Sequence, residues 1–289
     1  LIPRARTRTL KGSISKTTMQ FDLPPGWSVI TEYAETNEKM SVDNADRRFD
    51  QPSGWIAVGR LGVRRETIAG TRVAIAAPLG QSVRRMDKLA LLNWTLPELN
   101  TILPDALPRL TIISADDPMW RGGLSAPASI YIHSDRPLIS ENATSTLLHE
   151  TMHVAMDISA ADGYDWIVEG LAEYYSLELL RRGGDITTRR YRRALEDLEE
   201  WAAESDGLCA AESKGPTTAL AVLTFRKIDR QLKKASAGKV DLDVLTAAIS
   251  RSGEKVSLDS LRHDVTELLQ EPVAALSIDE LPGCEAYVN

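Results

Sequence analysis

Two histidines and a glutamate lie in one apolar run near the middle of the chain, in the pattern His149-Glu150-x-x-His153. The residues from 147 to 156 are otherwise mostly apolar or small, which predicts a helix buried on most of its circumference. Positions i and i+4 share one face of a helix, so both imidazoles can bind one metal ion. Glu150 is rotated about 100° from His149 and can reach a water molecule at that ion. Because unpaired buried imidazoles and carboxylates are costly, the pattern predicts a hydrolytic zinc site.

A zinc site with two histidines needs a third protein ligand. The segment from Asp165 to Tyr175 is expected to belong to a second helix, which Asp165 caps and Gly183-Gly184 ends. Glu169 in this segment is the candidate for the third ligand. Gly170 inside that helix costs about 1 kcal/mol relative to alanine. This cost indicates that another helix approaches closely beside Glu169.

Two further carboxylates are candidates for holding a ligating histidine in place. Glu173 lies one turn after Glu169 on the same helix face, and Asp157 has a similar relation to His153. A carboxylate that accepts the free N–H of a metal-binding imidazole fixes the orientation of the ring. The competing interpretation, two core histidines bonded to the backbone, leaves Glu150 and Glu169 unexplained.

At these residues the sequence resembles the gluzincins, the thermolysin-like zinc peptidases whose third ligand is a glutamate. Within that group it is similar to the glycyl aminopeptidases, which are relatives of aminopeptidase N. The resemblance implies that His149, His153 and Glu169 bind zinc, that Glu150 is the general base, and that the substrate is a peptide or protein. The matching segments are Gly122-Gly123-Leu124, His149-Glu150-x-x-His153, Trp166-x-x-Glu169-Gly170, Tyr174-Tyr175 and Lys214-Gly215.

The sequence departs from these aminopeptidases where they hold the substrate's free amine. In them the Gly-Gly-Leu segment is followed by a glutamate, whereas here Ser125 follows Leu124. We expect Gly122, Gly123, Leu124 and Ser125 to bind the substrate, with cleavage inside or at the end of a peptide left open. The following strand at 130–132 could pair with an extended peptide or be an ordinary strand of the sheet.

A second departure concerns the oxyanion of the tetrahedral intermediate. The aminopeptidases place a tyrosine two residues before the Lys-Gly pair, and here that position is Glu212. A carboxylate cannot donate a hydrogen bond to an oxyanion unless it is protonated. Tyr191 and His263 are the nearest substitutes, and a structural role is the competing interpretation for each. The departures motivate an alternative function, a zinc-binding pseudo-peptidase that acts as a binding or scaffold protein.

Composition narrows the remaining possibilities. The 289 residues carry a net charge of −7, which argues against nucleic acid as the main partner. No apolar run reaches the roughly 18 residues that a transmembrane helix needs. The chain begins with Leu1 rather than methionine, and we expect a processed protein that is exported. The expected cofactor is a zinc ion. Cys209 and Cys284 could form one disulfide after export or remain two thiols in the cytosol.

The order of predicted elements indicates an α+β fold. Residues 1–68 are expected to form a β-rich N-terminal domain or extension, with strands at 17–21, 27–31 and 55–59 and a surface loop at 40–52. Residues 69–289 are expected to form a thermolysin-like metallopeptidase domain, with a β lobe at 69–140 and a helical lobe at 141–289. The β lobe has predicted strands at 71–76, 109–113 and 129–133, and the predicted helices outside the metal site are at 81–103, 189–204, 216–234, 241–251 and 257–270.

Overall fold

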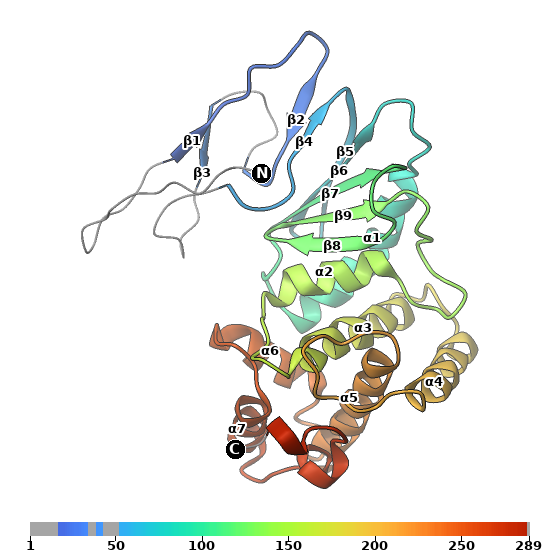
Figure 1. The fold of residues 1–289 in the computed structure, drawn as a ribbon, viewed down its shortest axis with the longest axis vertical. Coiled ribbons are helices and arrows are strands. Elements are labelled where there is room, and N and C mark those ends of the chain that lie inside the picture. Colours follow the sequence, from blue (N-terminus) through green and yellow to red (C-terminus); the bar gives the residue numbers. More distant parts are fainter. Residues whose placement is uncertain (1–16, 34–38, 43–51, 288–289) are drawn as a thin grey trace, which may run out of the picture. The chain divides into compact units, whose positions relative to one another are not determined.

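The computed structural model describes residues 17–33, 39–42 and 52–287, and Figure 1 shows their arrangement. The chain forms two compact units, one of Leu1–Leu89 with Pro108–Arg136 and one of Ala90–Leu107 with Pro137–Asn289. Every described strand belongs to the first unit, whereas the second unit is helical. Helix α1 (Arg85–Ile102) begins in the first unit and continues through Pro97 as a single helix. This mixture confirms the predicted α+β class.

The first unit is built on a five-stranded sheet with the strand order β5-β6-β7-β9-β8. Strands β6, β7 and β9 are parallel neighbours and carry nearly continuous buried runs, as expected for strands covered on both faces. The two outer strands, β5 and β8, pair antiparallel with their neighbours. The strands are β5 (Leu61–Ile68), β6 (Thr71–Pro78), β7 (Arg109–Ala115), β8 (Gly123–Ala126) and β9 (Ser129–His133).

Two small sheets precede this large one in the chain. Strand β1 (Thr17–Met19) pairs with β3 (Met40–Val42), and β2 (Ser28–Ile30) pairs with β4 (Ala57–Gly59). The predicted surface loop at 40–52 is wrong for its first three residues, because Met40 and Val42 are buried on one side of β3; residues 43–51 lie outside the described part. The predicted domain boundary after residue 68 falls at the β5–β6 turn, and that division stays a prediction.

Helices α3 and α5 are the central pair of the second unit (Figure 1). Helix α3 contacts α2 and α5, and α5 also contacts α4 and α6. The side chains of Thr187, Asp241 and Ser257 cap α4, α6 and α7, so local sequence sets where these helices begin. The helices are α2 (Thr146–Met156), α3 (Asp165–Arg182), α4 (Thr188–Ala202), α5 (Pro216–Ala235), α6 (Leu242–Ser252) and α7 (Leu258–Leu269), followed by 3₁₀ turns η1 (Ala274–Leu276), η2 (Ile278–Glu280) and η3 (Glu285–Tyr287). Within the described residues, no helix has the length and apolar character needed to cross a membrane.

A disulfide links the C-terminal segment of this unit to the loop before α5. Cys209 and Cys284 are bonded across 75 positions of sequence, and the Leu208 N–H donates to the Pro282 carbonyl beside them at 2.8 Å. The sequence left open whether these cysteines form a disulfide or remain two thiols, and in the structure they form the disulfide. A crosslink over so long a loop restricts the unfolded chain and thereby favours the folded one.

Gly170 lies at a close approach of α3 and α5. A Cβ atom at this position would be 2.6 Å from the Ala221 Cβ and 3.0 Å from the Phe225 ring. The expected close helix contact beside Glu169 is confirmed, and its partner is α5. A methyl group cannot rotate away from such a contact, so glycine is what allows the two helix backbones to approach.

Replacing Gly170 with alanine should therefore destabilise the protein. The substitution gains about 1 kcal/mol of helix propensity, but overpacking a closed core typically costs about 1–3 kcal/mol. We expect a net loss of up to about 2 kcal/mol in the free energy of unfolding, measured by urea denaturation. Adding Ala221→Gly to Gly170→Ala should recover part of this loss, because it removes the opposing methyl group. A Gly170→Ala variant as stable as the wild type would contradict this account of the helix contact.

Candidate metal centre

Helix α2 is fixed at both ends, and this sets the direction of its two histidines. The Ser145 side chain accepts a hydrogen bond from the Leu148 N–H at the start of the helix. At its end Asp157 adopts the left-handed conformation and donates its N–H to the His153 carbonyl at 3.1 Å. Most of the helix is buried, and the side chains of His149 and His153 are 16% and 14% exposed.

Helix α3 is joined to α2 by a pair of serines. The Ser176 hydroxyl accepts from the Ser145 N–H at 3.1 Å and lies 3.3 Å from the Ser145 carbonyl, to which it donates. The predicted capping role of Asp165 is wrong, since the N-cap residue is Tyr164 and its side chain makes no capping bond. The Asp165 carboxylate instead accepts the Ser213 N–H at 2.7 Å. It therefore holds a distant loop against the first turn of α3.

The structure brings His149, His153 and Glu169 together. The two Nε2 atoms are 3.0 Å apart, and each lies 3.3 Å from a carboxylate oxygen of Glu169. Each of the three residues offers one atom that could bind a metal ion, and these atoms all lie within 4.8 Å of one another. At a tetrahedral zinc ion with bonds of about 2.0–2.1 Å, neighbouring ligand atoms are about 3.3–3.4 Å apart. Two nitrogens and one oxygen at this spacing fit zinc.

Glu173 contacts the far side of the first imidazole. Its Oε2 lies 2.9 Å from the His149 Nδ1, so the ring can donate from Nδ1 and leave its Nε2 lone pair for a cation held between His149 and Glu169. This arrangement selects the tautomer that a metal-binding histidine requires. Asp157, the other carboxylate considered for such a role, is exposed at the C-cap of α2. Its proposed relation to His153 stays a prediction.

Charge is concentrated at this cluster. Burial lowers the pKa of His149, but hydrogen bonds and charge from Glu169 and Glu173 outweigh it and raise that pKa to about 10. Burial likewise raises the pKa of Glu169, and the two imidazoles outweigh it and hold that pKa far below its usual range. Each shift shows that the partly desolvated carboxylates attract positive charge. The site therefore stabilises a cation, either a proton or a metal ion.

A cavity of about 300 Å³ opens beside the cluster. It lies at the lower end of the size range of small-ligand sites, which is about 300–1,000 Å³. His149, Glu169 and Glu173 line one part of it. The rest of its wall comes from α4, α5 and the loop between them, and includes Leu198, Trp201, Ser213, Lys214 and Gly215. Glu150, on α2 between the two histidines, is 9% exposed.

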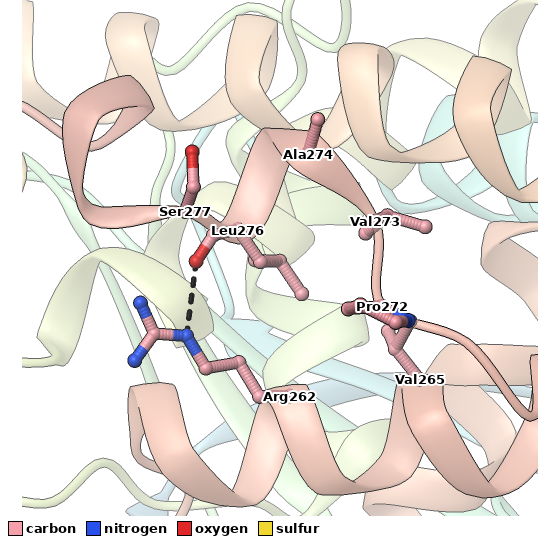
Figure 2. Close-up of a pocket in the computed structure, with 7 residues that line it drawn as sticks. All are labelled: Arg262, Val265, Pro272, Val273, Ala274, Leu276 and Ser277. Atoms are coloured by element: carbon pink, nitrogen blue, oxygen red, sulfur yellow. Dashed lines mark hydrogen bonds between the residues drawn. The ribbon is translucent and has the colours of Figure 1, made fainter.

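A second cavity, of about 440 Å³, lies between α7 and the segment around η1 (Figure 2). Its wall is mainly apolar, and among the described residues that line it Arg262 alone is ionisable. The Arg262 Nε donates to the Leu276 carbonyl at 2.9 Å, which joins the helix to the segment that follows it. The cavity is larger than the one beside the histidines, but the described residues that line it include no histidine, cysteine or carboxylate, so it has no metal-binding group and is not the candidate site.

The predicted substrate-binding residues lie in the first unit, where Gly122 directly precedes the outer strand β8 and the other three are part of it. The His133 N–H donates to the Gly122 carbonyl at 3.0 Å, and the register pairs Gly123 with Ile132. Hydrogen-bonded pairs alternate in an antiparallel ladder. The backbone groups of Gly123 and Ser125 therefore point away from β9, whereas those of Leu124 point toward it. At Gly122 the ring of Trp120, which is 59% exposed, lies over the backbone, and a Cβ there would displace that ring.

The structure separates the predicted oxyanion candidates from the cavity wall. The Tyr191 hydroxyl donates to the Glu178 carboxylate, and His263 is exposed on α7; neither lines the cavity described above. Glu212 is ion-paired with Lys214. Sequence reasoning missed Trp201 and Ser213, which do line it. The signal available for Ser213 was its place between Glu212 and Lys214-Gly215, the segment already singled out by the resemblance.

Comparison with known proteins identifies the fold. No protein-family model and no curated protein sequence match the chain. Among solved structures, an aminopeptidase N family protein from Idiomarina loihiensis is similar with a TM-score of 0.63 and 16% identity, over 88% of this chain and 57% of that one. Yeast LTA4 hydrolase in complex with bestatin gives a TM-score of 0.61 and 14% identity, over 93% and 46%. An M1 zinc metallopeptidase from Deinococcus radiodurans gives 0.53 and 18%, over 92% and 64%.

The chain thus spans about half to two thirds of the length of these structures. At such low identity the likeness establishes the fold and leaves residue roles to be tested. The expected resemblance is confirmed at that level: the chain has a gluzincin aminopeptidase-like fold.

Proposed function

We propose that this chain is a zinc-dependent peptidase in which His149, His153 and Glu169 hold the metal. The observation that carries the proposal is the triangle of two imidazole nitrogens and one carboxylate at 3.0–3.3 Å. The Glu173 contact on the far side of His149 supports it, because this partner orients the ring for a metal. The fold shared with zinc metallopeptidases is consistent with the same chemistry.

In this proposal Glu150 moves the proton. When bound, zinc supplies Lewis acidity to the scissile carbonyl and to the attacking water. Glu150 accepts a proton from that water as its oxygen bonds to the carbonyl carbon, and then passes the proton to the leaving amine. Its place on α2 beside His149 and its burial, at 9% exposed, support this role.

The substrate is proposed to be a peptide or protein that binds in an extended conformation. The outward backbone groups of Ser125, which is exposed on β8, support this, because the edge of a sheet can pair with an added strand. The backbone groups of Gly123 point the same way, but this residue is buried. Gly122 and Leu124 complete the proposed segment. Ser125, in place of a glutamate, favours substrates that do not depend on a paired terminal amine. The disulfide supports an exported location, since disulfides persist in oxidising compartments.

Replacing Glu150 with glutamine should abolish turnover without loss of zinc. Glutamine keeps the size of the side chain but cannot accept the proton, and removal of a general base costs about 10²–10⁴-fold in rate. A panel of internally quenched and N-terminally labelled peptides, assayed with zinc content by mass spectrometry, measures both effects. Wild-type protein that binds zinc fully but cleaves no peptide would favour the binding or scaffold alternative. Equal turnover in the Glu150→Gln variant would exclude the proposed base.

Replacing Glu173 with glutamine should weaken zinc binding. The variant loses the charge that fixes the His149 ring, and loss of such a partner typically costs about 10–100-fold in metal affinity. Competition with a chromogenic chelator gives the zinc Kd. Asp157→Asn is the matched control, because it removes a carboxylate of the same helix pair from an exposed C-cap. Weakening by Asp157→Asn instead of Glu173→Gln would reassign the ring-holding role to Asp157.

A further inference from the structure

The proposed peptidase lacks a donor at the position where its resemblance to aminopeptidases places a tyrosine. Glu212 stands there and is ion-paired with Lys214, whose hydrogen bond and charge lower the pKa of the Glu212 carboxyl. An ionised carboxylate accepts hydrogen bonds and repels a developing negative charge. The role of oxyanion donor must therefore belong to another group if the chemistry proceeds at this site.

Ser213, the next residue, lies in the wall of the cavity beside the candidate metal centre. It lines that cavity together with His149, Glu169 and Glu173. Its backbone N–H donates to the Asp165 carboxylate at 2.7 Å. Asp165 lies one helical turn before Glu169 on α3, so the helix that supplies the proposed third ligand also fixes Ser213.

The Ser213 hydroxyl has no hydrogen-bond partner among the described residues, although the residue is only 8% exposed. Buried hydroxyls in native proteins are nearly always paired, because an unpaired one loses its bonds to water without replacement. Other serines of this unit follow that rule; Ser176 and Ser236, for example, bond to backbone carbonyls. An unpaired donor on a residue that lines a candidate active site indicates a partner that arrives with the ligand.

We infer that the Ser213 hydroxyl donates a hydrogen bond to the substrate's carbonyl oxygen as that oxygen becomes negative, an inference that rests on the proposed peptidase function. As the water oxygen bonds to the carbonyl carbon, the π pair of the C=O bond moves onto the carbonyl oxygen. Ser213 keeps its proton throughout and stabilises that charge. When the C–N bond breaks, the pair returns to the carbonyl and Glu150 protonates the amine.

The hydroxyl reaches the substrate by a change of rotamer. The Ser213 oxygen is shielded from solvent in the structure described here, while the residue itself lines the cavity. A serine side chain has one rotatable bond with three staggered positions, and no existing hydrogen bond holds this one. The backbone stays anchored on Asp165 during that rotation, so the donor moves without moving the loop.

Ser213→Ala tests the inference in the zinc-loaded full chain. We expect kcat to fall by about 10²-fold with KM changed less than about twofold, because the lost bond forms only in the transition state. Ser213→Thr, which keeps a hydroxyl, should restore part of kcat. The melting temperature should stay equal to or above that of the wild type, since no folded-state bond is lost. The control Ser236→Ala removes a paired hydroxyl and should lower the melting temperature without this loss of kcat.

Binding of a phosphinic peptide, a tetrahedral anionic mimic, provides a readout that does not need turnover. Calorimetry should show its Kd rising by about 10²-fold in Ser213→Ala, while a matched carbonyl peptide binds as before. Unchanged kcat and unchanged phosphinic affinity, with Glu150→Gln inactive, would overturn the role of Ser213 and leave the peptidase function intact. If zinc-loaded wild type cleaves nothing, the proposed function falls, and equal phosphinic affinity of both proteins then overturns this inference as well.

Discussion

The electrostatic attraction between one partly buried carboxylate and two imidazoles is the interaction on which the candidate site depends. Glu169 lies 3.3 Å from both rings, and Glu173 holds one of them from behind. Removing these groups from water costs more than any one ion pair returns, so they are stable only when positive charge is shared among them. A divalent cation satisfies this condition better than a proton, because it bonds to all three facing atoms at once.

One face of α3 organises the surroundings of that interaction. Asp165, Glu169 and Glu173 follow one another at intervals of four residues, so they form a polar row along a helix that is otherwise mostly buried. Asp165 accepts a hydrogen bond from the Ser213 loop, Glu169 faces both histidines, and Glu173 contacts the far side of the His149 ring. Ser176, further along the helix, bonds to the start of α2. Gly170, beside Glu169, lets α5 approach on another side. Placement of the ligands is thus tied to the packing of three helices.

The parts of this arrangement that depend on local sequence could be predicted. The apolar run around His149 predicts α2, and helix periodicity alone relates that histidine to His153 and Glu169 to Glu173. The cost of a glycine inside a helix predicts the close contact at Gly170. Residues 40–42 could not be recognised as β3, because their pairing with 17–19 depends on a partner distant in sequence.

Contacts that span the chain escaped prediction for the same reason. Asp165 is of a residue type that commonly caps helices, yet its carboxylate accepts a hydrogen bond from the backbone N–H of Ser213, 48 positions later. That contact brings Ser213 to the cavity, and no periodicity or composition marks it in advance. The sequence left undecided whether Cys209 and Cys284 are bonded. Two cysteines allow one pairing, but they do not show whether the protein resides in an oxidising compartment. The fold and the cluster of His149, His153 and Glu169 are therefore more readable from this sequence than the groups proposed to act on the substrate.

The central claim is that His149, His153 and Glu169 bind one zinc ion, and a crystal structure of the zinc-loaded protein tests it most directly. Data collected on both sides of the zinc absorption edge would locate the metal without assumptions about its ligands. The account predicts one strong anomalous peak about 2.0–2.2 Å from both Nε2 atoms and from a Glu169 oxygen. A cluster closed by hydrogen bonds alone, with zinc bound elsewhere or absent at saturating concentration, would contradict it.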